Sequence, residues 1–430
     1  MHNYITKKVL GFKDENIKIL DFIEKKENIT IKIELKRVDH GCPRCGSITD
    51  KVHDYRIRKF KHGNLNGYNL SIKYNRRRYV CKECNKKFPE DNNFIDSYSK
   101  ISNQLNNLII KRLTNKHTFK DIAKDTNVSS STIIRRFDKH FSINKLELPE
   151  VISIDEFKKT NQSSKRGKYA LAIADPINKK LIDILENRRK FPLNNYLEKV
   201  PIKVLNNVKV VIIDMWEPYR DLIYKHFRNA NIVIDRFHYI RNIIWWLNDI
   251  RIKTMNSFKP NQKGYKLLKK FHKLLIKNPK DIHGIYSYNK WFNKMMSPKS
   301  IIDECLELNE KLKEAYKFYD DFQKATSQPF DTKVEALEFI DDFVTRLYAS
   351  NLDGSINLAN MFINWRHEIA NSLYLTYKLD NITYRYTNGF IEGVNNYIKT
   401  FRRMCYNIRN FERFITRIIT TFNQDFLIKA

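Results

Sequence analysis

The pattern of apolar and polar positions changes along the chain from one segment to the next. Before residue 98, alternation of apolar and polar residues, as in 68–74, predicts strands. Apolar residues recur at helical spacing in 102–141. After Pro149, short β-branched runs alternate with helical segments, and 240–379 is helical with little sign of strands. These changes predict a multidomain α/β protein rather than a single fold unit.

The segment after Pro149 has the element order of a ribonuclease-H-like core. Three strands are expected in succession before any helix, and two further strands follow, each after a helix. The five expected strands are 151–154, 168–174, 181–185, 208–213 and 232–234. The fourth is a continuous apolar run, which is typical of a central strand buried on both faces.

The patterns along the whole chain, together with the motifs described below, predict five parts. The expected parts are a zinc-ribbon region in 1–98, a helix-turn-helix domain in 99–148, the first part of the core in 149–242, an all-helical insertion in 243–380, and closing helices of the core in 381–430. The insertion is predicted because so long a helical stretch interrupts the α/β pattern.

The amino-acid composition indicates which kind of molecule the chain binds. The chain has 430 residues, 42% of them hydrophobic, which is enough to bury several cores. Its formal net charge of +31 favours nucleic acid, with an anionic membrane second, unless a general preference for Lys, Asn and Ile explains the charge. No run approaches the roughly 18 apolar residues of a membrane span. Residues 1–8 lack a signal-peptide pattern, so we expect a cytoplasmic, nucleoid-associated protein outside the membrane.

Four of the six cysteines form two CxxC pairs, Cys42 with Cys45 and Cys81 with Cys84. Two residues between ligands let a tight turn aim both thiolates at one tetrahedral ion. The pairs predict a zinc ribbon whose Zn²⁺ is structural, because four thiolates leave no open position for catalysis. A redox pair is the alternative. The two remaining cysteines stand alone and are expected to be incidental thiols, Cys305 and Cys405.

Two segments carry the residues expected to contact DNA. Three arginines lie between the CxxC pairs, although a solvated charged strand would look the same: Arg76, Arg77 and Arg78. In 102–141, two helical patterns separated by a turn near Val128 have helix-turn-helix spacing. The second helix is expected to enter the major groove with Ser130, Thr132, Arg135 and Arg136. A plain three-helix bundle is the alternative.

Polar residues that follow the apolar strands are candidates for catalysis. Asp155 follows the first strand, Asp214 the fourth, and Asp235 with His238 the fifth. A helix beginning near Thr387 or Asn388 places a carboxylate, two amides and a cation on one face, at i, i+3, i+4 and i+7. These residues are Glu392, Asn395, Asn396 and Lys399, and the arginines that follow are Arg402 and Arg403. Such a polar face suits a metal ion and a phosphate. The residues of this helix that are expected to contact DNA are Asn395, Asn396, Lys399, Arg402 and Arg403.

The order of these motifs resembles one family along nearly the whole chain. CPRC, CKEC, the helix-turn-helix, IDEF, IDMWEPYR, IDRFHY and NGFIEGVNNYIKTFRR are similar to the ISL-three family of bacterial insertion-sequence DDE transposases. The resemblance implies that Asp155, Asp214 and Glu392 form the catalytic triad and hold Mg²⁺ or Mn²⁺. It implies supporting roles for Asp235 and His238, which match an Asp-x-x-His signature. The alternative is that Asp235 caps the following helix and His238 fills its first turn.

Two positions depart from the family pattern, and two neighbouring acids are excluded from the triad. Tyr397 stands where a lysine is expected, and Asn407 stands where a glycine is expected, although asparagine tolerates a left-handed backbone. Glu156 is expected on the opposite strand face from Asp155. Asp175 is expected in a turn.

Three carboxylates suit in-line cleavage of a phosphodiester, in which two hard cations roughly 3.5–4 Å apart activate the nucleophile and stabilise the leaving oxygen. We therefore expect a transposase that binds double-stranded DNA, both terminal inverted repeats and target, as a homodimer or higher oligomer. Water would be the first nucleophile and the freed 3′-hydroxyl the second. The alternatives are a catalytically silent DNA-binding regulator and a metal-dependent nuclease.

Overall fold

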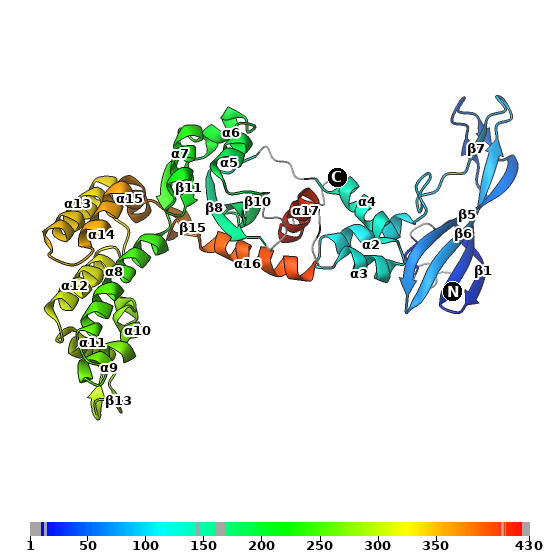
Figure 1. The fold of residues 1–430 in the computed structure, drawn as a ribbon. Coiled ribbons are helices and arrows are strands. Elements are labelled where there is room, and N and C mark those ends of the chain that lie inside the picture. Colours follow the sequence, from blue (N-terminus) through cyan, green and yellow to red (C-terminus); the bar gives the residue numbers. More distant parts are fainter. Residues whose placement is uncertain are drawn as a thin grey trace. The chain divides into compact units, whose positions relative to one another are not determined.

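The computed structural model describes residues 10–12, 15–142, 147–159, 168–405, 408 and 410–423 (Figure 1). The chain divides into two compact units. Unit 1 comprises Met1–Ile143 and Tyr397–Ala430, and unit 2 comprises Asn144–Asn396. Within the described ranges, no helix combines the length and the apolar character needed to span a membrane.

Unit 1 begins with a five-stranded sheet in which the order is β1-β2-β6-β5 and β7 pairs with β6. Its strands are β1 (Ile17–Lys25), β2 (Asn28–Leu35), β5 (Val52–Leu65), β6 (Tyr68–Val80) and β7 (Lys87–Pro89). A small separate pair is formed by β3 (His40–Gly41) and β4 (Ile48–Thr49). Alternate residues of β2 and β6, including Ile31 and Ile72, are fully buried, which confirms the strands expected from alternation.

Three helices after this sheet confirm the predicted helix-turn-helix: α2 (Asn103–Leu113), α3 (Phe119–Thr126) and α4 (Ser130–His140). Thr118 and Asp121 form a capping box at the start of α3, and Ser129 caps α4. Asn127 ends α3 with a left-handed φ of 51°. Val128 in the turn is buried, as expected.

The C-terminal part of α16 (Gly389–Met404) and α17 (Phe411–Phe422) belong to unit 1. Tyr397, the first departure from the family pattern, packs its ring 5.0 Å from the ring of Phe422, and Lys116 Nζ lies 5.1 Å above the Tyr397 ring. The aromatic residue therefore serves packing between α16 and α17. Asn407, the second departure, lies outside the described residues.

Arg417 joins α17 to the helix-turn-helix. Its side chain is buried and donates to the carbonyl oxygens of Asn115 at 3.0 Å and His117 at 2.8 Å. Its guanidinium lies 5.4 Å from the ring centre of Phe119 and 5.7 Å from that of Phe137. A buried cation held by carbonyls and ring faces fixes the relative position of these helices.

We expect Arg417→Ala to destabilise this part of unit 1 by about 2–4 kcal/mol, because the change leaves a cavity in place of a buried side chain and removes its hydrogen bonds to the carbonyls of Asn115 and His117. Hydrogen exchange of 103–140, followed by mass spectrometry, should become at least about tenfold faster. Arg413 is a suitable control, since its ion pair with Asp138, at 2.7 Å, is on the surface. Exchange at the wild-type rate in Arg417→Ala would show that Arg417 does not hold the helices together.

Unit 2 contains the mixed sheet that the sequence predicted, in the order β10-β9-β8-β11-β12. Its strands are β8 (Val151–Lys158), β9 (Tyr169–Asp175), β10 (Lys180–Leu185), β11 (Val210–Ile213) and β12 (Asn231–Ile234). The first three are antiparallel, and β8, β11 and β12 are parallel. The helices between the strands are α5 (Lys190–Leu197), α6 (Ile202–Asn207) and α7 (Glu217–His226). This arrangement confirms the ribonuclease-H-like core.

The end of β8 differs most from the expectation, while the other strand boundaries agree to within two residues. We expected β8 to end before Asp155, but it continues to Lys158 because β9 pairs with it along that length, with Asp155 opposite Ala172 and Lys158 opposite Tyr169. Asp155 therefore lies within the strand. Pairing of β8 with β11, in contrast, reaches only Ser153.

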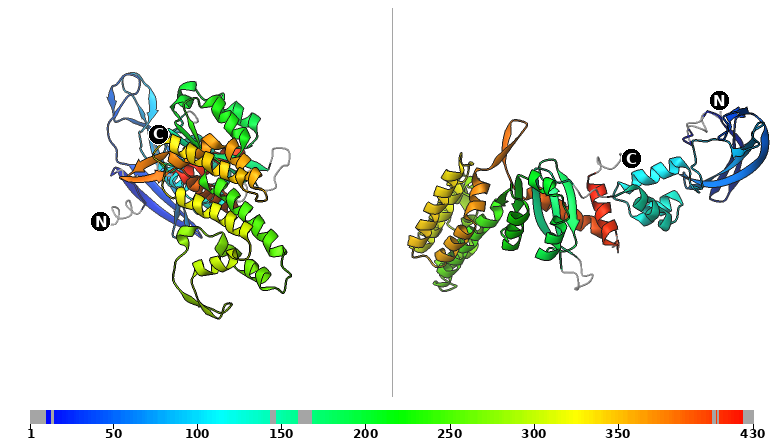
Figure 2. Two further views of the ribbon diagram at one scale, coloured as in Figure 1. Left: turned by 90° about the vertical axis from the view of Figure 1, so that its left-hand side faces the viewer. Right: turned by 90° about the horizontal axis from the view of Figure 1, so that it is seen from above.

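The insertion is mainly helical, and its helices pack side by side (Figure 2). They are α8 (Arg236–Asn256), α9 (Lys263–Lys270), α10 (His272–Leu275), the 3₁₀ turn η2 (Pro279–Asp281), α11 (Pro298–Leu306), α12 (Glu310–Ala325), α13 (Lys333–Ala349), α14 (Ser355–Asn364) and α15 (Arg366–Tyr374). Buried rings of Phe322, Phe343 and Phe362 meet at its centre.

The helical segment also contains two short hairpins that the sequence analysis did not specify. They are β13 (Ser287–Asn289) with β14 (Lys294–Met296), and β15 (Thr376–Leu379) with β16 (Ile382–Arg385). Most of their residues are partly or fully exposed, so they lack the alternation of buried and exposed positions that marks a strand in sequence.

Candidate active site and nucleic-acid interface

The register of two parallel strands brings Asp155 and Asp214 together. Ile212 of β11 pairs with Ser153 of β8, and the two aspartates lie two residues beyond these partners. Parallel strands carry equivalent positions to the same edge of a sheet, so the two carboxylates lie near enough for the charge of Asp214 to raise the pKa of Asp155. The sequence predicted this meeting, and the pairing supplies its physical cause.

Asp155 lies in a partly buried, electronegative environment. Its Oδ1 accepts from the backbone N–H of Glu156 at 2.7 Å, and its Oδ2 accepts from Nδ2 of Asn395 at 2.7 Å. The pKa of the Asp155 carboxyl is raised to about 7, first by burial and then by the negative charges of Asp214, Glu156 and Glu392, in that order. The third predicted carboxylate, Glu392, is therefore near enough to influence the first.

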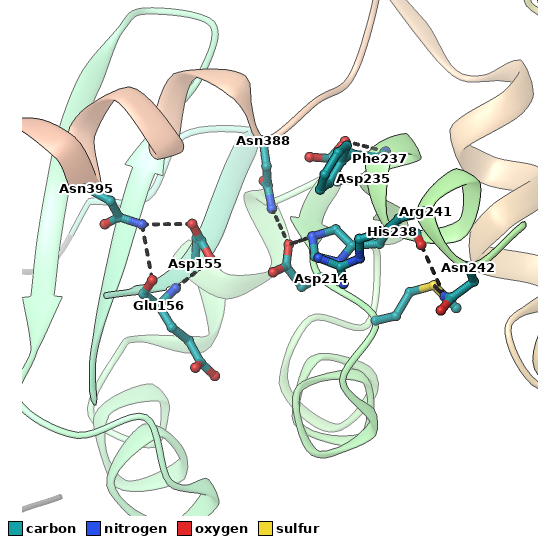
Figure 3. A network of polar contacts seen from close by, with 11 residues as sticks. Asp155, Glu156, Asp214, Asp235, Phe237, His238, Arg241, Asn242, Asn388 and Asn395 are labelled. Carbon is teal, nitrogen blue, oxygen red and sulfur yellow. Dashed lines mark hydrogen bonds and ion pairs between the residues drawn. The ribbon is translucent and has the colours of Figure 1, made fainter. Parts of the chain in front are cut away.

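Asp214 is held from two sides through a single oxygen. His238 Nε2 lies 2.8 Å from Asp214 Oδ1, and Asn388 Nδ2 donates to the same oxygen at 3.0 Å (Figure 3). Arg241 Nη2 lies 3.1 Å from His238 Nδ1, and since arginine only donates, Nδ1 is the acceptor. The proton of the neutral imidazole is then on Nε2, which donates to Asp214.

Asp235 and His238 have different positions in this network. The Asp235 carboxylate accepts from the backbone N–H of Phe237 at 3.3 Å and caps α8, while burial raises its pKa. His238, in the first turn of α8, reaches the predicted catalytic carboxylate directly. The helix cap, which was our alternative for both residues, describes Asp235.

The residues on the polar face of α16 have different locations, because one contacts Asp155 and the others lie at the surface. Asn395 was expected to contact DNA, but its side chain is buried and donates to Asp155 and, at 3.4 Å, to the carbonyl of Glu156. Asn388 was considered only as a helix cap, and no local sequence pattern distinguishes a capping asparagine from one that also reaches Asp214. The other predicted residues on α16 are exposed or partly exposed: Glu392, Asn396, Lys399, Arg402 and Arg403.

The two excluded acids have structural partners. Glu156 accepts from the hydroxyl of Tyr219 at 2.7 Å and pairs with Arg188. Asp175, which was expected in a turn, is instead the last residue of β9; it is buried, and its Oδ1 accepts from the backbone N–H groups of Ile177 and Asn178 at 2.9 Å in the turn that follows. Both carboxylates are therefore engaged in contacts within the sheet and its flanking elements.

The donor set at the sheet edge fits hard divalent cations. It offers carboxylate oxygens, which Mg²⁺ prefers, and the mutual repulsion seen in the pKa of Asp155 is what a cation relieves. Among the described residues, none donates a hydrogen bond to Oδ2 of Asp214, whose side chain is 35% exposed. The carboxylates do not form a compact group such as the cysteines form; two ions about 4 Å apart require a wider arrangement.

The four predicted zinc ligands converge in unit 1. Their sulfur atoms all lie within 4.8 Å of one another, and three of the distances are 3.5 Å, from Cys42 to Cys84 and from Cys45 to Cys81 and Cys84. Tetrahedral Zn–S bonds of about 2.3 Å place sulfurs about 3.8 Å apart. The cluster is thus consistent with structural zinc. Cys305 and Cys405 are buried and separate from it.

The three arginines of β6 do not have equal access to solvent. Arg77 is only 5% exposed; it donates to the Leu35 carbonyl at 2.7 Å and pairs with Glu90 at 3.3 Å, so the expected DNA contact is wrong for this residue. Side chains alternate across a strand, and the middle arginine faces the interior. Its neighbours, Arg76 and Arg78, remain partly exposed.

A basic groove of about 550 Å³ lies along α4. Its lining includes five cations and no carboxylate: Lys61, Lys100, Arg135, Arg136 and Lys139. Thr132 also lines the groove, Ser130 is exposed at the start of α4, and Tyr98 stands fully exposed at the edge. Cations beside a helix N-terminus and an exposed aromatic ring suit a nucleic-acid backbone.

A ribonuclease-H-like sheet with two aspartates on adjoining parallel strands, combined with a zinc ribbon and a helix-turn-helix, defines the class of DDE transposases. The chain belongs to the ISL3 family: residues 152–418 match its DDE transposase domain, residues 39–84 the zinc-finger of transposase IS204/IS1001/IS1096/IS1165, and residues 90–140 the helix-turn-helix domain of transposase family ISL3. The transposase for insertion sequence element IS1001 of Bordetella parapertussis is 22% identical over an alignment of 398 residues, which covers 89% of this chain and 88% of the relative.

Proposed function

We propose that this transposase uses Asp155, Asp214 and Glu392 to hold two Mg²⁺ or Mn²⁺ ions, cleaves DNA at the ends of its insertion sequence and joins the freed ends to target DNA. The single observation that carries the proposal is the strand register, which places Asp155 beside Asp214. The influence of Glu392 on the pKa of Asp155 adds the third carboxylate.

The residues around the carboxylates have positioning roles in this proposal. When bound, the divalent ions activate the nucleophile and stabilise the leaving oxygen. Asn395 orients Asp155, and Asn388 with His238 orients Asp214, so that the remaining oxygen lone pairs face the ions. Water is the nucleophile of the first step, and the released 3′-hydroxyl is the nucleophile of the second.

The N-terminal zinc ribbon and the helix-turn-helix recognise the terminal inverted repeats. Zn²⁺ bound by the four clustered cysteines stabilises the ribbon, and the groove along α4 receives the phosphate backbone while the start of α4 meets the bases. We further propose a homodimer or higher oligomer, since both ends of the element must be held together for transfer.

One incubation distinguishes the possible functions. The full chain is mixed with Mg²⁺ and a duplex that carries the terminal repeat of the element encoding it, together with a plasmid target. A transposase joins the duplex end to the plasmid. A nuclease only nicks the duplex, and a regulator only shifts its mobility, so either result would contradict strand transfer.

We expect His238→Ala to slow cleavage by about 10–100-fold, because the loss of a positioning partner costs less than the loss of a metal ligand. Folding and binding of the terminal repeat should be retained. His226→Ala is the matched control, since that side chain bonds to Asn194 at 2.9 Å, away from the carboxylates. Cleavage at the wild-type rate, or a lower melting temperature alone, would show that His238 only stabilises the first turn of α8 and does not position Asp214.

A further inference from the structure

The helical insertion contains two neighbouring segments of opposite charge. Residues 259–300 include eleven lysines, no arginine and a single acid, Asp281, which gives a formal net charge of +10. Residues 301–353 include thirteen acids and six cations, which gives −7. A chain-wide preference for lysine cannot produce this contrast within one domain. The positive segment therefore calls for a local explanation.

The lysines of the positive segment are accessible to a binding partner. All eleven are exposed. Within the part of the chain that the structure describes, Lys294 is the one that pairs with an acid, at 3.3 Å from Glu304. Unpaired cations held this close together repel one another, and the repulsion is relieved when a polyanion binds.

Contacts between α9 and the β13–β14 hairpin combine the lysines into one surface. Lys270 Nζ lies 4.8 Å from the ring centre of Trp291, and Lys263 Nζ lies 5.9 Å from that of Phe292. Phe292 also stacks on Phe271 at 6.0 Å. We call the exposed lysines of residues 263–294, which include α9, α10 and this hairpin, the lysine surface. Exposed tyrosines lie in the same region, Tyr286 at 60% and Tyr288 at 58%.

One helix connects the lysine surface to the catalytic carboxylates. The first turn of α8 carries His238, which bonds to Asp214, and the helix ends at Asn256, three residues before Lys259 (Figure 1). At 1.5 Å per residue its 21 residues extend about 30 Å. This length corresponds to about nine base pairs of duplex at 3.4 Å each.

We propose that the lysine surface binds the phosphate backbone of duplex DNA without reading its sequence, about one helical turn from the site of cleavage. The inference rests on the proposed function, because it assumes that DNA reaches the carboxylates. Lysine ammonium groups are mobile point charges that suit a uniform polyanion, whereas recognition of fixed geometry favours the arginine fork. The acidic helices beyond residue 301 restrict the duplex to the lysine side.

The test compares two full-chain variants that lose the same charge. One replaces Lys266, Lys273, Lys277 and Lys290 with Gln; in the described structure these side chains form no ion pair or ring contact, so the packing should survive. The other, the matched control, replaces the four exposed lysines of α12 with Gln: Lys311, Lys313, Lys317 and Lys324. The probe is a 40-base-pair duplex, about 136 Å long, without sequence from the element.

Affinity of the lysine-surface variant for this duplex should fall at least about tenfold at roughly 0.15 M salt. The slope of log K against log salt should decrease by about 2–4, since each phosphate that the protein no longer neutralises lowers it by about 0.9. The α12 control should stay within about twofold of wild type. Acetylation of wild-type lysines, with and without duplex, gives a second reading: Lys266 and Lys290 should be protected, and Lys311 should not.

Equal losses in both variants, or no protection of Lys266, would overturn the proposal, because the effect would then belong to total charge. A change in sedimentation without loss of DNA affinity would also overturn it, since the surface would then bind a second copy of the chain. Mg²⁺-dependent nicking by the wild-type protein is measured separately. Its absence would contradict the proposed function while leaving the binding comparison intact, so the two failures are distinguishable.

Discussion

Asp214→Ala is expected to abolish Mg²⁺-dependent nicking while binding of the terminal repeat remains within a few-fold of wild type. Asp214 lies beside Asp155 through the parallel register, so its loss removes a carboxylate that both proposed ions depend on. The zinc ribbon and the helix-turn-helix, which we propose to bind the repeat, are in unit 1, which does not contain Asp214. The loss of rate should exceed the roughly 10–100-fold effect of a positioning residue.

Two further variants sharpen this prediction. Asp249→Ala removes an exposed carboxylate from α8 and should leave nicking unchanged. Asp214→Asn keeps an oxygen that can accept from His238 and Asn388 but removes the negative charge, so it should be as inactive as Asp214→Ala. Nicking is followed on a supercoiled plasmid that contains the terminal repeat. Retained nicking by Asp214→Ala would refute the assignment of the triad.

Cys84→Ser is expected to release zinc and to weaken binding of the terminal repeat by at least about tenfold. Binding of structural zinc contributes on the order of 10 kcal/mol to the folding of small ribbons, and a hydroxyl does not replace a thiolate ligand. Cys84 contacts two of the other sulfurs at 3.5 Å, so its loss opens the cluster. Metal content is measured by elemental analysis, and binding by fluorescence anisotropy.

Cys305→Ala serves as the control for thiol loss, since Cys305 is buried in the insertion and should change neither zinc content nor binding of the terminal repeat. Cys42→Ser should behave as Cys84→Ser does. If the purified wild-type protein contained no zinc and all four clustered thiols reacted with a thiol reagent, the ribbon would not be a zinc site.

Local patterns in the sequence were sufficient for much of the fold. Buried central strands such as β11 are recognisable because both faces are apolar, and α3 and α4 are recognisable by their capping residues. The exposed hairpin β13–β14 has no such pattern. The end of β8 was also missed, because it depends on pairing with β9 rather than on composition.

In the candidate site, too, the residues that belong to a local sequence pattern could be predicted, whereas their contacts with distant residues could not. Asp155 and Asp214 could be found because each follows a run of apolar residues, and the parallel pairing of these two runs brings both aspartates to one edge of the sheet. The position of Asn395 on a polar helix face was predictable, but its contact with Asp155 was not. Arg77 was predicted to contact DNA because its neighbours in sequence are cations. Its partner in the structure, Glu90, is thirteen residues away and could not be inferred from that local pattern.

The sequence by itself determined the family, the spacing of the four cysteines, the strand order of the core and the contrast of charge within the insertion. These features depend on residues close together in the chain or on a periodicity that repeats. Only the tertiary structure decided which oxygen of Asp214 is occupied, which arginine of β6 is buried, and how α9 and a hairpin join into the lysine surface. The physical reason is that a polar side chain acquires its role from the group opposite it, and distant packing selects that group.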